Sequence, residues 1–151
     1  MFPQEAKIHH NMGINLKRAG KLADALACYK SAMDLEPDNS VFLYNTGLLY
    51  NIQSSHEDAI AVLEKSIETN RENVYAYLAL GDAHEKNQSP VQALAVYRQL
   101  CDLGVNVHGL TEKIQFLEKK IQEQQGAAEK RAEQERKQQQ DQMAKEQDEE
   151  L

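Results

Sequence analysis

The sequence predicts an all-α protein: a solenoid of three helix-turn-helix units, followed by a capping helix and a polar tail. Three observations support this fold class. Residues of the same kind return every 34 positions over residues 6–107. The 151 residues include only 3 Pro and many Ala, Leu, Gln, Glu and Lys, which favour helix. After residue 121 the composition becomes almost wholly polar.

The repeat is defined by several independent series of residues. Glycine recurs at Gly13, Gly47 and Gly81. Small, bulky and acidic side chains recur with the same step: Ala25, Ala59 and Ala93; Tyr29, Leu63 and Tyr97; Asp34, Glu68 and Asp102. The units span residues 6–39, 40–73 and 74–107, after an N-terminal extension at residues 1–5. A single unit cannot bury its apolar face, so we expect the three units to stack.

Each unit contains two helical patterns separated by a short polar turn, at residues 19–21, 53–55 and 87–89. Ser55 and Ser89 are placed to cap the second helices, and Pro90 takes the first helical position. Residues 36–39 end one helix, and Asn39 or Ser40 can cap the next. The repeated glycines lie inside the first helices, where each costs about 1 kcal/mol. We therefore expect them to allow close contact with Tyr29, Leu63 and Tyr97.

These motifs resemble the tetratricopeptide repeat (TPR) family over Ala6–Val107. The family pattern of Gly, Ala, an aromatic residue, Ala and Pro is matched in the first unit by Gly13, Ala25, Tyr29, Ala32 and Pro37. The third unit matches with Leu80, Gly81, Ala93 and Tyr97 and departs at Leu100 and Val105. The second unit departs at Leu63, Ser66 and Arg71. The resemblance implies a right-handed α-solenoid that binds other proteins.

Residues 108–121 are expected to form the capping helix. Leu110, Ile114, Leu117 and Ile121 make one apolar stripe at helical spacing. Such a helix would cover the exposed face of the third unit. The alternative is a coiled-coil seam, but the next seam positions hold Gln124 and Ala128.

Residues 122–151 form a charged, Gln-rich tail with nine Gln, nine acidic and five basic side chains. Too few apolar residues are present to bury a core, so we expect a mobile or extended helix, interrupted at Gly126. Pairs such as Arg131 with Glu135 and Glu133 with Lys137 support helix modestly. The acidic end, residues 146–151, is expected to be a solvated charge run, with a docking tail as the alternative.

The charge distribution favours a protein or peptide partner. The formal net charge is −7, and no segment has the concentrated basic face that nucleic acid binding needs. No apolar stretch approaches the roughly 20 residues that span a bilayer, and no signal peptide is evident, so we expect no membrane insertion and a cytoplasmic location. Association with the cytoskeleton or a cilium is a narrower alternative within that location. Cys28 and Cys101 are expected to be small buried hydrophobes, with a disulfide as the alternative.

Catalysis is not expected. No HExxH, no phosphate-binding glycine loop and no nucleophile motif is present, so we predict no enzyme activity, cofactor or metal. His9 and His84 take packing positions, and His10 is a candidate to titrate against a ligand carboxylate.

The partner-binding residues are expected on the first helices, which line the concave side of such a stack. We call this set the predicted groove: Lys7, His10, Asn11, Ile14, Lys17, Val41, Tyr44, Asn45, Leu48, Tyr75, Leu78, Asp82 and Glu85. It runs from a basic end through an apolar, aromatic middle to an acidic end. Tyr and Leu side chains on this face suggest pockets for the apolar anchors of a peptide or helix. The alternative is that some of them contact the cap helix or their own neighbours.

Some TPR proteins clamp the acidic C-termini of heat-shock chaperones with five polar and basic residues. At the corresponding positions this chain has His10, Ile14, Asn45, Tyr75 and Ala79, and only Asn45 matches. We therefore predict an adaptor that does not bind chaperones by this clamp. The alternatives are a structural subunit of a multi-subunit assembly, such as an axonemal or intracellular transport complex, and self-association through the open N-terminal face.

Overall fold

The computed structural model describes the backbone of residues 3–149 and the side chains of residues 4–145. Within this range it has seven helices: α1 (Pro3–Arg18), α2 (Leu22–Leu35), α3 (Ser40–Ile52), α4 (His56–Thr69), α5 (Val74–Lys86), α6 (Pro90–Asp102) and α7 (Leu110–Glu149). The chain divides into two compact units, residues 1–110 and residues 111–151. The described residues form an all-α helical repeat, as predicted.

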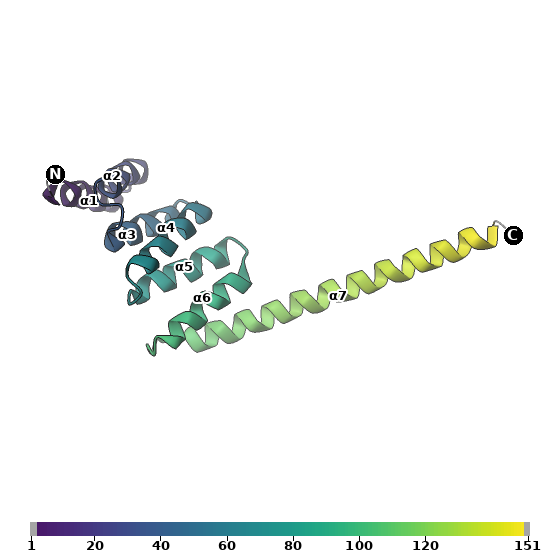
Figure 1. The fold of residues 1–151 in the computed structure, drawn as a ribbon. Coiled ribbons are helices and arrows are strands. Elements are labelled where there is room, and N and C mark those ends of the chain that lie inside the picture. Colours follow the sequence, from purple (N-terminus) through teal and green to yellow (C-terminus); the bar gives the residue numbers. More distant parts are fainter. Residues whose placement is uncertain (1–2, 150–151) are drawn as a thin grey trace. The chain divides into compact units, whose positions relative to one another are not determined.

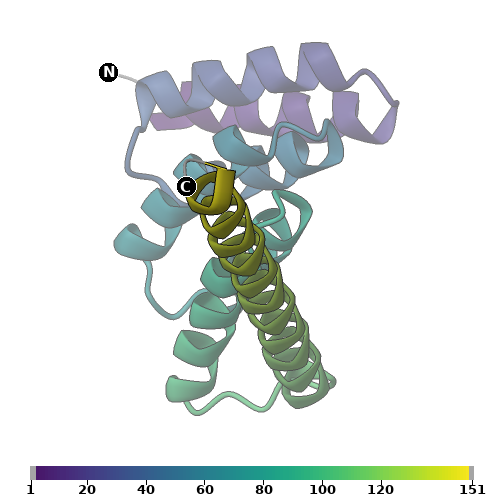
Figure 2. The ribbon, with the colours of Figure 1, turned by 90° about the vertical axis from the view of Figure 1, so that its right-hand side faces the viewer.

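The first unit consists of three helical hairpins, α1/α2, α3/α4 and α5/α6, which follow one another in chain order (Figures 1 and 2). The helices α3 and α5 begin at residues 40 and 74, where the predicted second and third units begin, whereas α1 begins at Pro3, inside the predicted N-terminal extension. The core lies between the helices of a hairpin and between neighbouring hairpins. For example, Ala6, Ala32 and Phe42 form one buried cluster that joins the first hairpin to the second.

The repeated glycines are packing positions, as expected. A Cβ placed on Gly13 would lie 2.5 Å from the ring of Tyr29, and one on Gly47 would lie 2.5 Å from Leu63 Cγ. A Cβ on Gly81 would overlap the ring of Tyr97. The bulky partners Tyr29, Leu63 and Tyr97 are at most 1% exposed. Glycine is therefore required because the partner side chain already fills the space beside the helix.

The turns within the hairpins share a geometry that the sequence analysis did not identify. Gly20, Ser54 and Gln88 stand 34 residues apart and all have positive φ, of 76°, 60° and 57°. The next residue in each turn closes a bond to the preceding helix, such as Ser55 N–H to the Tyr50 carbonyl at 2.9 Å. This left-handed residue with a six-to-one hydrogen bond is the Schellman ending of a helix.

The helix caps only partly follow the prediction. Asn39 caps α3, because its side-chain oxygen accepts hydrogen bonds from Val41 N–H at 3.1 Å and Phe42 N–H at 3.3 Å. Ser55 and Ser89 occupy the N-cap positions of α4 and α6, but neither side chain bonds to the helix it precedes. The capping prediction for these two serines was wrong. Pro90 does stand at the first position of α6.

The helix α7 is continuous from Leu110 to Glu149. The expected interruption at Gly126 was therefore wrong. The helix also continues across the predicted boundary between the capping helix and the tail, at residues 121 and 122. Of the predicted side-chain pairs, Lys137 lies 3.0 Å from Glu133. The acidic end, residues 146–151, lies outside the side chains that the structure describes. A capping role for residues 108–121 stays a prediction.

The cysteines differ from the expectation of burial. Both are free thiols; Cys28 is half-buried and Cys101 is exposed. Met33, which is the counterpart of Cys101 in the first repeat, packs against a core cluster containing Phe42 of the next repeat. The 34-residue pattern does not continue beyond residue 107, so Cys101 has no equivalent of Phe42 in a following repeat.

Candidate functional site

The predicted groove residues lie on α1, α3 and α5, one helix from each hairpin. Four of them are exposed: Lys7, Asn11, Val41 and Tyr75. Eight are half-buried: Ile14, Lys17, Tyr44, Asn45, Leu48, Leu78, Asp82 and Glu85. Only His10 is buried, at 7% exposure.

His10 is held by groups of the protein itself. Its ring stacks on Phe42, with ring centroids 4.6 Å apart, and on Tyr29, at 5.4 Å. The Asn45 side-chain nitrogen lies 2.9 Å from His10 Nε2. Burial, and secondarily the charge of Lys17, lower the pKa of the His10 imidazole. These contacts hold the ring within the protein, so His10 is poorly placed to titrate against a ligand carboxylate.

Two acidic groove residues on α5, and Asn51 on α3, also have internal partners. The Asn51 side-chain nitrogen donates to the Ala79 carbonyl at 3.2 Å, which links α3 to α5. Asp82 forms an ion pair with Lys86 at 2.8 Å. Tyr97 donates to the Glu85 carboxylate at 2.6 Å, and burial followed by this bond raises the pKa of the Tyr97 hydroxyl far above its usual range. These bonds reduce the number of polar groups that a ligand could engage.

The middle of the predicted groove is apolar and carries no charge. Val41 is 53% exposed, and Tyr44 and Leu48 are half-buried beside it on α3. Burial raises the pKa of the Tyr44 hydroxyl, and the neighbouring Tyr75 adds to this shift. Ile52, 56% exposed on α3, extends the apolar surface. The sequence analysis omitted Ile52, although the 34-residue step marks it as the equivalent of Arg18 and Lys86.

An apolar pocket lies where α5 meets the segment after α6. It has a volume of about 410 Å³ and is lined by Val74, Tyr75, Leu78, Val105, Asn106, Val107 and His108. Tyr75 at its edge is 68% exposed. Sequence reasoning predicted Tyr75 and Leu78 here but missed residues 105–108. The alternation of Val105 and Val107 with polar neighbours was the available signal.

The basic end of the predicted groove is formed by α1. Lys7, Lys17 and Arg18 carry three positive charges on this helix, and no ion pair with them occurs among residues 4–145. Arg18 was not among the predicted residues. The face therefore has unpaired cations at one end and paired carboxylates at the other.

The N-terminal end of the helical repeat exposes apolar side chains. Ile8 is 61% exposed and Met12 is 44% exposed, both on α1. Their equivalents in the second repeat, Phe42 and Thr46, are 4% and 0% exposed. Phe42 is buried because it packs against Ala6 and Ala32 of the first hairpin.

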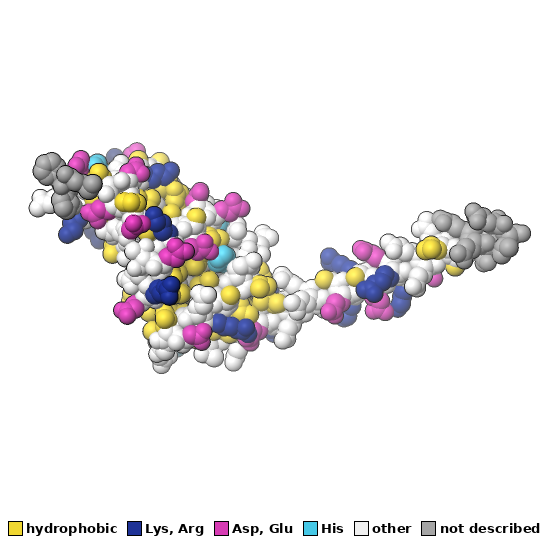
Figure 3. All heavy atoms as spheres, in the orientation of Figure 1, with side chains coloured by type: hydrophobic (Ala, Val, Ile, Leu, Met, Phe, Trp, Pro, Cys, Tyr) yellow, Lys and Arg dark blue, Asp and Glu magenta, His cyan; other side chains and the backbone are white. Residues whose placement is uncertain are grey.

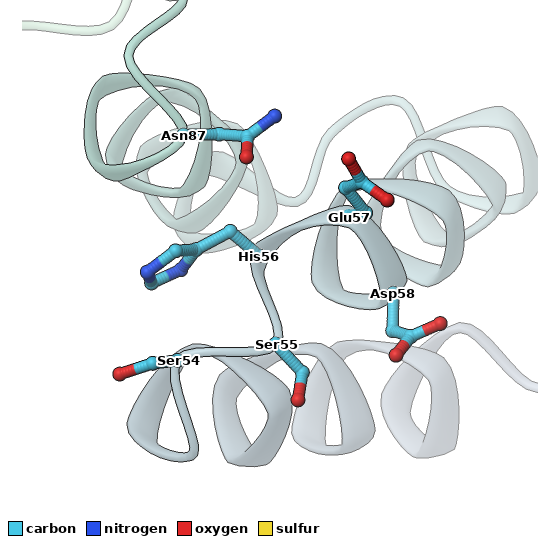
Figure 4. A pocket seen from close by; sticks show the side chains of 6 residues that line it. All are labelled: Ser54, Ser55, His56, Glu57, Asp58 and Asn87. Atoms are coloured by element: carbon cyan, nitrogen blue, oxygen red, sulfur yellow. The ribbon is translucent and has the colours of Figure 1, made fainter.

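A second pocket lies at the turn between α3 and α4 and does not resemble an active site. It has a volume of about 270 Å³ and is lined by Ser54, Ser55, His56, Glu57, Asp58 and Asn87. Figure 4 shows that the His56 ring points away from the carboxylates of Glu57 and Asp58. Among the described residues, no group of three or more His, Cys, Asp or Glu could hold a metal ion.

The surface differs between the two compact units. On the face drawn in Figure 3, apolar side chains are exposed between charged ones over the hairpins, whereas basic and acidic side chains alternate along α7. In the part of the chain that the structure describes, no helix combines the length and apolar character required to cross a membrane.

The sequence matches the tetratricopeptide repeat family over residues 10–70 and 53–104. Among known structures, the first TPR of Spaghetti (RPAP3) bound to the HSP90 peptide SRMEEVD is similar, with a TM-score of 0.73 and 23% identity over 80% of this chain and 96% of that one. The first TPR domain of human RPAP3 has a TM-score of 0.73 and 22% identity, covering 83% and 98%. The Sgt2 TPR domain from Aspergillus fumigatus has a TM-score of 0.72 and 20% identity, covering 82% and 83%.

No curated protein matches the sequence significantly. At these levels of identity the structural likeness concerns the fold alone.

Proposed function

The chain belongs to the tetratricopeptide repeat family, and from that premise we propose that it binds a peptide or helix of a partner protein in the predicted groove. The family consists of non-catalytic scaffolds for protein–protein interaction. The observation that carries the proposal is the apolar surface of the first helices, where Val41 and Tyr75 are exposed and Tyr44 and Leu48 are half-buried. Aromatic and aliphatic side chains of this kind are typical of the centres of binding sites.

The proposal excludes a carboxylate clamp. A clamp needs cationic and amide donors that reach the terminal carboxylate groups of a peptide. Here Ala79 is only 7% exposed, Ile14 and Tyr75 carry no positive charge, and burial lowers the pKa of His10 and so disfavours its charged form. Asn45, which is the one matching residue, directs its amide to His10. We therefore expect the predicted groove to select apolar anchors instead of a C-terminal carboxylate.

Fluorescence anisotropy with the labelled peptide SRMEEVD tests the exclusion directly. We expect no saturable binding to the wild-type chain at micromolar concentrations. A variant that restores the clamp, His10→Lys/Ile14→Asn/Tyr75→Lys/Ala79→Arg, should gain binding that amidation of the peptide C-terminus abolishes, provided circular dichroism shows it folded. Carboxylate-dependent binding by the wild type would contradict the proposal.

The positive side of the proposal is tested with helical and extended peptides that carry Leu and Phe anchors. Binding should be measured for the wild type and for Tyr44→Ala/Leu48→Ala. Loss of two buried contacts of this size should weaken binding by about tenfold or more. Equal affinity of the two proteins would place the contact elsewhere.

The 40-residue helix α7 favours a second candidate function, a structural subunit of a larger assembly. From Gln122 to Lys145 its side chains are almost all exposed, so this helix could lie along neighbouring subunits. Deleting residues 122–151 separates the candidates. An adaptor keeps its groove-dependent partner after the deletion, whereas a structural subunit is no longer incorporated.

A further inference from the structure

We infer that the partner segment is amphipathic and charge-polarised: its acidic end lies over α1, and an apolar anchor enters the pocket between α5 and residues 105–108. This inference rests on the proposed function and specifies the chemistry of the partner. It follows from a difference between the two ends of the predicted groove. The cations on α1 form no ion pair among residues 4–145, whereas the carboxylates on α5 have partners within the protein.

At the α1 end, positive charge comes from Lys7, Lys17 and Arg18. Lys7 and Arg18 are exposed and Lys17 is half-buried, and no ion pair holds any of them within residues 4–145. Lys7 and Lys17 are separated by ten residues, which is about 15 Å along a helix. Several acidic side chains spread over such a length would match these separated positive charges better than a single carboxylate would.

The rest of the face adds no comparable positive charge. On α3 the residues from Val41 to Ile52 are all uncharged. On α5 the positive charge of Lys86 is paired with Asp82, and the Glu85 carboxylate accepts from Tyr97. An acidic segment is therefore attracted to α1, and it would meet two carboxylates if it lay over α5 instead.

The opposite end of the face offers an apolar pocket. Its volume of about 410 Å³ and its lining by Leu78, Val105 and Val107 suit a Leu or Phe side chain. Tyr75 at the edge, 68% exposed, could close over such an anchor. The direction of the bound segment is then fixed by two unlike contacts, one ionic at α1 and one apolar at α5.

This arrangement differs from recognition of a chain end. The carboxylates that α1 would contact belong to Asp or Glu side chains, so a blocked C-terminus should make no difference. The ionic share of the affinity should also fall as salt concentration rises, because exposed charges are screened.

The probe is a synthetic peptide of about four helical turns with three Glu at one end and Leu and Phe at i, i+3 and i+4 spacing toward the other. A nitroxide label is attached to the acidic end in one version and to the apolar end in a second. Broadening of backbone amide signals of the full-length chain then reports which helix lies near each end. Affinity is measured in parallel for peptides with free and amidated C-termini.

We expect the acidic-end label to broaden amides of Lys7 to Arg18 and the apolar-end label to broaden those of residues 105–108. The variant Lys7→Ala/Lys17→Ala should bind the peptide about tenfold more weakly. The matched variant Lys21→Ala/Lys30→Ala, which removes two lysines of the same hairpin outside the predicted groove, should bind as the wild type does. Amidation should leave the affinity unchanged.

Reversed or equal broadening by the two labels overturns the inference, as does an unchanged affinity of Lys7→Ala/Lys17→Ala. If the peptide still binds when either result is found, the proposed function is not affected. Failure of the peptide to bind at all, or binding that Tyr44→Ala/Leu48→Ala does not weaken, contradicts the proposed function itself.

Discussion

Gly81 has no side chain because the ring of Tyr97 occupies the space where a Cβ would stand. The hydroxyl of Tyr97 donates a hydrogen bond to the carboxylate of Glu85, which lies on the next turn of α5. One bulky residue thus fixes both the distance between two helices and the orientation of a groove carboxylate. This coupling makes Gly81 a sensitive position for the stability of the third repeat.

Replacing Gly81 by Leu should destabilise the protein by about 1–3 kcal/mol or more, because the core beside it has no space for a larger residue. Thermal melting followed by circular dichroism measures the effect. Gly126→Ala is the matched control, because no atom lies within 4 Å of a Cβ at that position and alanine favours helix. An unchanged melting temperature for Gly81→Leu would contradict the packing of α5 on α6.

His10 should make the stability of the first hairpin sensitive to pH. Burial holds the folded-state pKa of this imidazole below its ordinary value of 6.5. As pH falls below that value, the unfolded state binds a proton that the folded state resists, so stability is lost. Burial lowers the pKa of His84 as well, while Glu64 opposes that shift.

Melting temperatures measured from about pH 7 to about pH 5 test this expectation. The wild type should lose stability over this range, and His10→Gln should show a smaller loss while being less stable near pH 7. If the melting temperatures of the wild type and of His10→Gln fell equally with pH, protonation of His10 would not oppose folding.

Roles that depend on side-chain size could be predicted from the sequence, since Gly13 and Tyr29 recur with the period of the fold. Roles that depend on hydrogen bonding could not. His10 and Asn45 are 35 residues apart, so their bond exists only after two hairpins have stacked. No sequence pattern indicates that His10 and Asn45 would bond to each other instead of facing a ligand.

Among the helices, α3 has the N-cap that should contribute most to stability. Asn39→Ala removes two hydrogen bonds to free backbone N–H groups and should cost about 1 kcal/mol of stability. Ser55→Ala, at the N-cap of α4, should cost much less because that side chain makes no cap bond. Denaturant unfolding of the two variants compares them directly, and equal losses would contradict the assignment of the caps.

The prediction for α7 failed at Gly126 for a simple energetic reason. One glycine costs a helix only about 1 kcal/mol, and Ala127 and Ala128 follow it directly. Charged pairs such as Glu133 with Lys137 add modest support. A single glycine in such a sequence weakens a helix without ending it.

At the scale of the whole molecule, the 34-residue period was sufficient to predict the hairpins and the residues on their first helices. It could not predict the pocket beside residues 105–108, because this segment lies where the repeat pattern ends. The period also carries no information about which side chains would be neutralised internally. The chemistry of the predicted groove therefore depends on contacts within a hairpin, such as Tyr97 with Glu85, and between hairpins, such as Asn45 with His10.

Binding of a partner protein through α1, α3 and α5 is the central claim, and affinity capture from the source cell tests it most directly. Captured proteins should be compared by mass spectrometry for the wild type, for Tyr44→Ala/Leu48→Ala, and for Ile67→Ala/Gln99→Ala on the second helices α4 and α6 as the control. We predict that the groove variant loses at least one partner that the wild type and the control both retain. Identical partner sets for the wild type and the groove variant would contradict the claim and move the contact to the second helices or to α7.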